Sequence, residues 1–187
     1  MSNHARGLWG YSGRTPAGSE LTIQATGMGG PSAALVLADL AKLGLRRAVR
    51  VGTCAGLDPA AALGDLLLVG EARAEGGSGA AFGIDDGEGA APDPDLTASL
   101  ADELGTDART ASVVSLDTHP PAGAGEAGGV AADMQTLALL ARATELGVAV
   151  AALLIVAEAA TDARLEGEPL EDAAKHAGQG AAAVLST

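Results

Sequence analysis

The chain has 187 residues, of which 48% are apolar, and this is long enough to build one domain with a sizeable core. Its formal net charge of −13 disfavours nonspecific binding to nucleic acid or anionic membranes, because such binding depends on clustered Lys and Arg. A single cysteine excludes an intramolecular disulfide, and no apolar run has the length or flanks of a signal peptide or membrane span. We therefore expect a cytoplasmic protein with one domain over residues 1–187.

Predicted strands and helices alternate along the chain, judged from hydrophobic periodicity and from Gly and Pro at their ends. The predicted strands cover residues 20–26, 48–53, 63–73, 109–116 and 148–156. The predicted helices cover residues 31–43, 96–104, 133–146 and 169–185. This alternation favours an α/β fold in which helices cover both faces of a largely parallel sheet.

Two segments between these elements are rich in small and polar residues. Residues 75–95 are almost all Gly, Ala, Asp, Glu, Ser and Pro, and this composition buries little surface. We therefore predict a long, acidic, low-complexity loop or partly disordered lid there. A second Gly- and Pro-rich loop is expected over residues 117–129.

The turn between the first predicted strand and helix is rich in glycine. Gly27, Gly29 and Gly30 precede Pro31, which fits the first helical turn because no N–H is needed there. Such a turn before a helix N-terminus is typical of an anion site. Dinucleotide binding is the first alternative, but Ser32 stands where the fingerprint has its third Gly or an Ala, and no acidic residue ends the second strand.

Arg50 lies inside an otherwise apolar strand, VRVGTC, and a buried Arg needs an anionic partner. One partner is an Asp or Glu of this acidic chain, in a structural ion pair. The other is a ligand, because Thr53 supplies a hydroxyl and the turn at Gly52 and Gly56 exposes backbone N–H groups. Together these features favour a phosphate or carboxylate site.

Five segments of the chain carry a resemblance to a known family. They are TGMGGPSAALVLADLAKLG, RVGTCAGL, GDLLLVGEAR, DMQTLALLARATELGV and LLIVAEAATD. Their order and spacing resemble the nucleoside phosphorylase family, which contains hexameric purine nucleoside phosphorylases, uridine phosphorylases and nucleosidases. The likeness runs from about Leu8 to the C-terminus. It implies a three-layer α/β/α sandwich, a homo-oligomer, and cleavage of a nucleoside N-glycosidic bond with phosphate or water as acceptor.

The resemblance also implies roles for single residues. The phosphate-binding positions are Arg50, Thr53 and Gly27. The ribose-binding positions are Met28, Met134 and Gln135. The base-binding positions are Cys54, Ala55, Gly56, Asp117 and Thr118, and Glu158 stands where the family has its catalytic acid. For the two methionines the competing interpretation is core packing, and for Glu158, Asp117 and Asp133 it is a helix cap or a solvated loop end.

The chain departs from the family pattern at three places. The Gly-Asp-Pro-x-Arg phosphate loop of the family is missing from this sequence. Gln135 replaces a Glu, which reduces a charge-assisted hydrogen bond of about 1.5–3 kcal/mol to about 1 kcal/mol. Glu158 is one methylene longer than the Asp that the family carries.

We therefore expect a pentosyltransferase that takes phosphate as co-substrate and acts on a purine or pyrimidine nucleoside without a further cofactor. A catalytically weak ligand-binding or scaffold protein and a phosphate-independent nucleosidase are the alternatives. No metal site is expected, because the three histidines are scattered and share no ligand spacing with Cys54. The serines form no G-x-S-x-G elbow.

Overall fold

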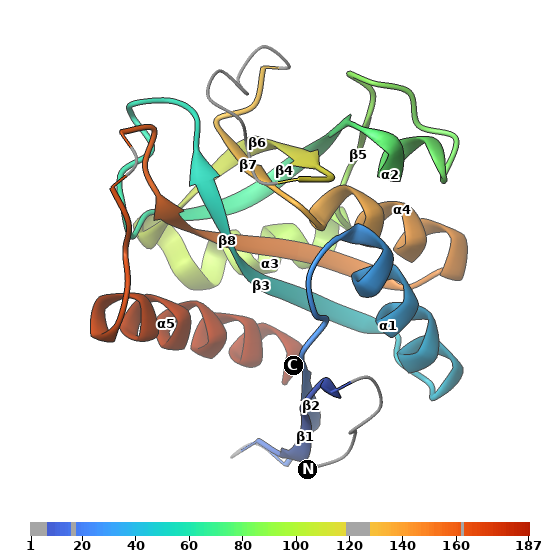
Figure 1. The fold of residues 1–187 in the computed structure, drawn as a ribbon. Coiled ribbons are helices and arrows are strands. Elements are labelled where there is room, and N and C mark those ends of the chain that lie inside the picture. Colours follow the sequence, from blue (N-terminus) through green and yellow to red (C-terminus); the bar gives the residue numbers. More distant parts are fainter. Residues whose placement is uncertain (1–6, 16–17, 119–127, 162) are drawn as a thin grey trace.

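The computed structural model describes residues 7–15, 18–118, 128–161 and 163–187. Its main sheet has six strands in the order β5-β4-β6-β7-β3-β8 (Figure 1). The strands are β3 (Arg47–Gly56), β4 (Leu66–Glu75), β5 (Gly89–Ala90), β6 (Ala108–Leu116), β7 (Ala131–Asp133) and β8 (Ala149–Glu158). The α/β class agrees with the sequence analysis, and the sheet mixes parallel and antiparallel pairings.

The longest pairings of this sheet, β3 with β8 and β4 with β6, are parallel. β7 is parallel to β6 but antiparallel to β3, and β4 is antiparallel to both β5 and β8. The additional pairing of β4 with β8 joins two strands that stand far apart in the sheet order. β3, β8, β4, β6 and β7 therefore form a closed ring of strands.

Helices cover both faces of the sheet (Figure 1). α1 (Gly30–Lys42) packs beside α4 (Thr136–Leu146), and α3 (Pro94–Leu104) packs beside α5 (Glu168–Leu185). The α1/α4 side holds the larger apolar cluster, which includes Leu37, Val69, Leu137, Leu140 and Leu154. The α3/α5 side holds a second cluster, which includes Leu66, Leu100, Leu153, Ile155 and Val184.

The first predicted strand does not join the main sheet. β2 (Glu20–Gln24) pairs antiparallel with β1 (Gly10–Arg14), a strand that the sequence analysis missed. The hairpin forms its own two-stranded sheet beside the C-terminus of the chain (Figure 1). The partner of β2 is thus the nearest extended segment in the sequence, so hairpin pairing took the place of the parallel pairing that alternation suggested.

The predicted lid over residues 75–95 is structured. It contains the short helix α2 (Gly77–Ala80) and the strand β5, and Pro94 already belongs to α3. Its acidic side chains bind backbone: Asp86 Oδ1 accepts from Gly76 N at 2.9 Å, and Glu88 Oε2 accepts from Asp85 N at 3.0 Å. Composition alone concealed these local hydrogen bonds. A 3₁₀ turn, η2 (Gly105–Asp107), follows α3.

No helix in the described part of the chain is both long and apolar enough to cross a membrane.

Candidate functional site

Ala55, near the end of β3, lies between two strands that carry predicted site residues. In the register, Ala132 of β7 is its partner on one side and Glu158 of β8 its partner on the other. The segment Asp133–Gln135 directly follows Ala132. The fold thus brings the predicted base-lining backbone, the predicted ribose segment and Glu158 together from three separate parts of the sequence.

Arg50 forms a buried ion pair with Asp133. Its Nη2 lies 2.9 Å from Asp133 Oδ2, and the two side chains are 9% and 1% exposed. The sequence analysis had left a structural ion pair open as one of two partners for Arg50, and the structure confirms that this pair exists. Each charge compensates the other, since neither could be buried alone.

Asp133 is also the centre of a hydrogen-bond network. Its Oδ1 accepts from Ser115 Oγ at 2.6 Å, and its Oδ2 accepts from Thr136 N at 3.0 Å and from Thr136 Oγ1 at 2.6 Å. Ser115 Oγ in turn accepts from Leu137 N at 2.9 Å. Because Asp133 accepts from the backbone N–H of Thr136 from outside the helix, α4 begins at Thr136 rather than at Asp133 as predicted.

Gln135 connects the Gly-rich turn to the ion pair. Its Nε2 donates to Gly27 O at 2.6 Å. Its Oε1 accepts from Thr26 Oγ1 at 3.3 Å and from Arg50 Nη2 at 3.4 Å. An amide can make this bridge because it carries both a donor and an acceptor, whereas a carboxylate has no N–H to offer Gly27. The predicted phosphate and ribose positions Arg50, Gly27 and Gln135 are therefore in direct contact.

Two nitrogen atoms of the Arg50 guanidinium have no partner in the described part of the chain. Within the described residues, Nε and Nη1 are buried and have no hydrogen-bond partner. The guanidinium folds over Gly52, where an added Cβ would lie 2.7 Å from Arg50 Cζ. A buried donor without a partner costs about 1–3 kcal/mol, more when the group is charged. Such a group is suited to a bound oxyanion.

The Gly-rich turn brings the N-terminus of α1 to the same region. Gly29 caps the helix with φ 82°, and no side chain caps it. Gly27 is likewise in the left-handed region, with φ 74°. The uncapped N–H groups and the helix dipole make this end of α1 attractive to an anion.

A cavity opens directly beside this turn. Its volume is about 350 Å³, within the range of small-molecule sites. It is lined by the first turn of α1 on one side and by the α2 region and the segment after β6 on the other, through Gly29, Gly30, Pro31, Gly77, Ala81 and Asp117. Asp117, a predicted base-binding residue, thus borders the same cavity as Gly29, which follows Gly27 by two residues.

Other predicted site residues lie less favourably. Strand alternation places Thr53 with its partner Ile155 on the α3/α5 side of β3, whereas Arg50 faces the α1/α4 side. The hydroxyl of the exposed Thr53 is therefore not beside Arg50, contrary to expectation. Met28 is 82% exposed, which contradicts its alternative interpretation as a core residue. Met134 is half-buried, and Thr118 is exposed beside Asp117.

Cys54, a predicted base-binding residue, lies near the end of β3. Its side chain is buried, and the thiol donates to Ile155 O at 3.5 Å. Burial first, and then the negative charge of Asp133, raises the pKa of the thiol to about 12. The side chain is thus an uncharged core group at neutral pH, and only the backbone of residues 54–56 remains available to line a ligand.

Glu158 ends β8 with a partly exposed carboxylate. Its Oε2 lies 3.4 Å from Arg164 Nη2, and the Glu158 side chain is 20% exposed. An isolated β-bridge also joins these two residues. These contacts are in line with the solvated loop-end interpretation, and the backbone of Glu158 lies next to Ala55.

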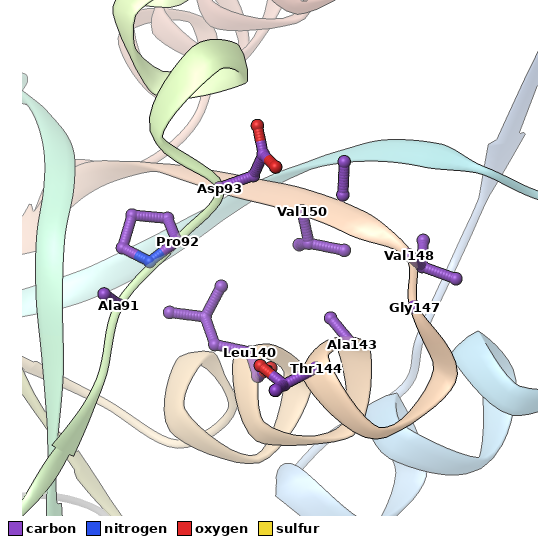
Figure 2. Close-up of a pocket in the computed structure, with 10 residues that line it drawn as sticks. Ala91, Pro92, Asp93, Leu140, Ala143, Thr144, Gly147, Val148 and Val150 are labelled. Carbon is purple, nitrogen blue, oxygen red and sulfur yellow. The ribbon is translucent and has the colours of Figure 1, made fainter.

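A second cavity lies away from these residues (Figure 2). It is formed by the segment before α3, the end of α4 and the start of β8, with Pro92, Asp93, Leu140, Thr144 and Val150 among its lining residues. Figure 2 shows the Asp93 carboxylate beside it, and that carboxylate already caps α3 by accepting from Leu96 N at 2.9 Å. None of the predicted site residues lines this cavity.

Two buried residues of the hydrogen-bond network were not predicted as site residues: Ser115, and Asp133 as the partner of Arg50. Ser115 was detectable as the one hydroxyl near the end of the apolar run SVVSL, where a buried polar group requires a partner. Residues 119–127 of the predicted second loop lie outside the described residues. No group of three or more His, Cys, Asp or Glu in the described part of the chain is arranged to hold a metal ion.

Comparison with known proteins adds to this geometry. Residues 2–187 match the sequence profile of the Phosphorylase superfamily. A DeoD-type purine nucleoside phosphorylase of Alkaliphilus metalliredigens is 29% identical over 169 residues, which cover 83% of this chain and 71% of that protein. A guanosine phosphorylase of Halorubrum lacusprofundi is 40% identical over 62 residues, 33% of this chain and 26% of that protein. A DeoD-type enzyme of Geobacillus kaustophilus is 36% identical over 67 residues, 35% of this chain and 28% of that protein.

Proposed function

Because the chain belongs to the phosphorylase superfamily, we propose that it is a nucleoside phosphorylase that cleaves the N-glycosidic bond of a purine nucleoside with phosphate as acceptor. The substrate class is supported by the names of its relatives, a DeoD-type purine nucleoside phosphorylase and a guanosine phosphorylase. A pyrimidine nucleoside such as uridine is the competing substrate, and the assay below includes it.

The observation that carries this proposal is that Arg50 is buried with part of its guanidinium unpartnered within the described residues. A guanidinium that is 9% exposed, with two nitrogen atoms unpartnered within the described residues, is suited to an oxyanion. Gly27 and the uncapped N-terminus of α1 approach from the Gly-rich turn and offer backbone N–H groups to the same anion. We therefore assign phosphate to Arg50 and to this turn. Thr53 lies on the other face of β3, so its predicted contact with the phosphate is less well supported.

The remaining roles follow from what lies around Arg50. Met134 and Gln135 continue from β7 and would contact the ribose, with Met28 closing over it from the exposed turn. The base would lie against the backbone of residues 54–56 and in the cavity bordered by Asp117, with Thr118 at its rim.

The reaction requires opposite charges on the two sides of the glycosidic bond. Departure of the base leaves positive charge on the sugar and negative charge on the base. Phosphate held at Arg50 serves as the nucleophile on one side, and Glu158 beside Ala55 donates a proton to the departing base on the other. No cofactor other than phosphate is needed for these steps.

The test is release of free base from inosine, guanosine, adenosine and uridine, followed by absorbance with and without phosphate. Phosphate-dependent release that is lost in Arg50→Ala supports the proposal. Arg47→Ala is the matched control, because Arg47 lies on the same strand but donates to Val184 O, away from the Gly-rich turn. Absence of release from every nucleoside by the folded protein would contradict the proposal.

A second candidate is a nucleosidase that uses water. It is favoured by the ion pair itself, because Asp133 already neutralises the charge that a phosphate dianion requires. Gln135 in place of a carboxylate also weakens the grip on the ribose. The same assay separates the two, since a nucleosidase releases base at the same rate without phosphate. A protein that binds nucleosides by calorimetry and releases no base would instead be a ligand-binding or scaffold member of the superfamily.

Four further parts of the proposal concern the whole protein: its layers, its domain organisation, its assembly and its location. Helices on both faces of the sheet support the three-layer α/β/α interpretation, and the larger and smaller apolar clusters support a single domain. Assembly into a homo-oligomer and a cytoplasmic location remain predictions.

A further inference from the structure

We propose that Asp133 acts as a built-in counter-ion that sets the charge of the Arg50 site, so that the site prefers singly charged oxyanions to dianions. This inference rests on the proposed function, because it takes Arg50 to be the anion-binding residue. It goes beyond that function by naming the residue that decides which anion is accepted.

The first step is that the carboxylate of Asp133 is buried among hydrogen-bond donors and pairs with Arg50. Its side chain is 1% exposed, and its oxygens lie near Arg50 Nη2, Thr136 N, Thr136 Oγ1 and Ser115 Oγ. The guanidinium and the backbone amide can only donate, and Ser115 Oγ is already an acceptor for Leu137 N. These donors and Arg50 together compensate the negative charge of the Asp133 carboxylate.

The second step is that its charge acts on any ligand of Arg50. Asp133 Oδ2 lies 2.9 Å from Nη2. An anion bound at Nε or Nη1 would therefore be separated from the carboxylate only by the guanidinium itself. At such separations, two charges inside a protein interact strongly even at an effective dielectric constant of about 20. The ligand therefore meets a pair with no net charge rather than a free cation.

The third step is that a second negative charge on the ligand gains little. Attraction to Arg50 and repulsion from Asp133 nearly cancel, so a dianion keeps most of its desolvation penalty without added compensation. Removing the charge of Asp133 reverses this balance. The lone buried guanidinium then attracts a dianion more strongly than a monoanion, because no carboxylate repels the second charge.

The experiment compares sulfate, a dianion, with methanesulfonate, a monoanion in which a methyl group replaces one of the four oxygens about the tetrahedral sulfur. Binding is measured by calorimetry and by thermal stabilisation at equal ionic strength. In Asp133→Asn, the affinity ratio of sulfate to methanesulfonate should rise on the order of tenfold or more over the wild type, since each charge at these distances is worth at least one factor of ten. Asp65→Asn is the matched control, because Asp65 pairs with Arg109 at 3.7 Å on the surface, and its ratio should stay unchanged.

A purely structural Asp133 would give a different result. Asp133→Asn would then lose the same amount of stability in sulfate as in methanesulfonate, and the affinity ratio of the two anions would stay unchanged. That result would show the inference to be wrong. A variant that stays unfolded even in concentrated sulfate would also overturn it, because the anion should replace the missing charge. If the wild type and Arg50→Ala bind neither anion, the anion site of the proposed function fails as well. An unchanged ratio with Arg50-dependent binding refutes the counter-ion role alone.

Discussion

At the scale of single residues, Arg50 depends on the missing side chain of Gly52, two positions along the same strand. An added Cβ at Gly52 would lie 2.7 Å from Arg50 Cζ and 2.9 Å from Nη2, which is closer than packed atoms allow. We expect Gly52→Ala to displace the guanidinium, to lower the free energy of unfolding by about 1–3 kcal/mol through overpacking, and to weaken sulfate binding. Urea denaturation and calorimetry measure the two effects.

Gly13→Ala is the control for this substitution. Gly13 lies in a strand of the hairpin, and its added Cβ would meet nothing within 4 Å. Its stability should stay within about 0.5 kcal/mol of the wild type. If Gly52→Ala behaved like Gly13→Ala in both measurements, the guanidinium would not occupy the place that the structure gives it.

Burial of the Cys54 thiol makes the free energy of unfolding decrease with pH in the alkaline range. Burial raises the pKa of its thiol from 9.0 to about 12, so between these values the unfolded chain loses a proton that the folded chain keeps. Stability from this group is complete below pH 9 and falls by about 1.4 kcal/mol per pH unit above it. We expect Cys54→Ala to remove that part of the slope. Denaturation of both proteins from pH 8 to 11 gives the comparison, and parallel slopes would show that the thiol ionises equally in both states.

The sequence predicted which residues belong to the site better than it predicted their partners. An apolar strand with one Arg shows that Arg50 needs an anion, but it does not show which one, because Asp133 is 83 positions away in sequence (133 minus 50). Thr53 was misplaced because a spacing of three along a strand puts two side chains on opposite faces. Gly27 and Gln135 were identified from motifs, and the contact between them depends on the packing of α1 beside α4.

At the scale of elements, α5 holds two glycines with opposite surroundings. Gly178 faces open space, whereas an added Cβ at Gly180 would lie 2.7 Å from Leu104 Cδ2 in the contact between α3 and α5. We expect Gly178→Ala to raise the free energy of unfolding by about 0.5–1 kcal/mol, because alanine loses less backbone entropy in a helix. Gly180→Ala should lose that gain and lower stability by about 1–3 kcal/mol through overpacking. Thermal unfolding of the two variants tests the pairing, and equal shifts would mean that the α3–α5 contact is looser than described.

Element prediction succeeded where a local signal was strong. α1, α3 and α5 start with a proline in the first turn, and the predicted bounds of each agree with the structure within about two residues. β7 was missed because three residues show no periodicity, and it displaced the predicted start of α4. The acidic segment after β4 was called a loop because hydrogen bonds such as Asp86 to Gly76 leave no trace in composition.

At the scale of the whole molecule, the closing of the strand ring could not be predicted from the sequence. It depends on the antiparallel contact of Leu66–Leu68 in β4 with Leu153–Ile155 in β8, and both segments read simply as buried strands. Twist and curvature, which decide whether two such strands meet, are properties of the assembled sheet. The hairpin shows the same limit, since nothing in its sequence says that it pairs apart from the main sheet.

The hairpin and the main sheet should unfold as separate units. β1 and β2 pair with each other and, among the described strands, with no other, while Ser19 Oγ ties the hairpin to Ser186 O at 2.8 Å. A two-stranded hairpin is marginally stable in water on its own, whereas the ring is supported by both apolar clusters. Local opening of the hairpin therefore requires less free energy than global unfolding.

The single tryptophan of the chain makes this difference measurable. Trp9 adjoins β1, and its backbone oxygen accepts from Ala25 N at 2.9 Å beyond the end of β2. We expect Trp9 fluorescence to change at a lower urea concentration than helical circular dichroism, which reports the main sheet and its helices. In the double variant Trp9→Phe with Phe82→Trp, the fluorophore moves to the half-buried position 82 after α2, and the two transitions should coincide. Coincident transitions in the wild type at every protein concentration would show that the hairpin is part of the same cooperative unit. Coincidence only at high concentration would show that a second copy of the chain stabilises it.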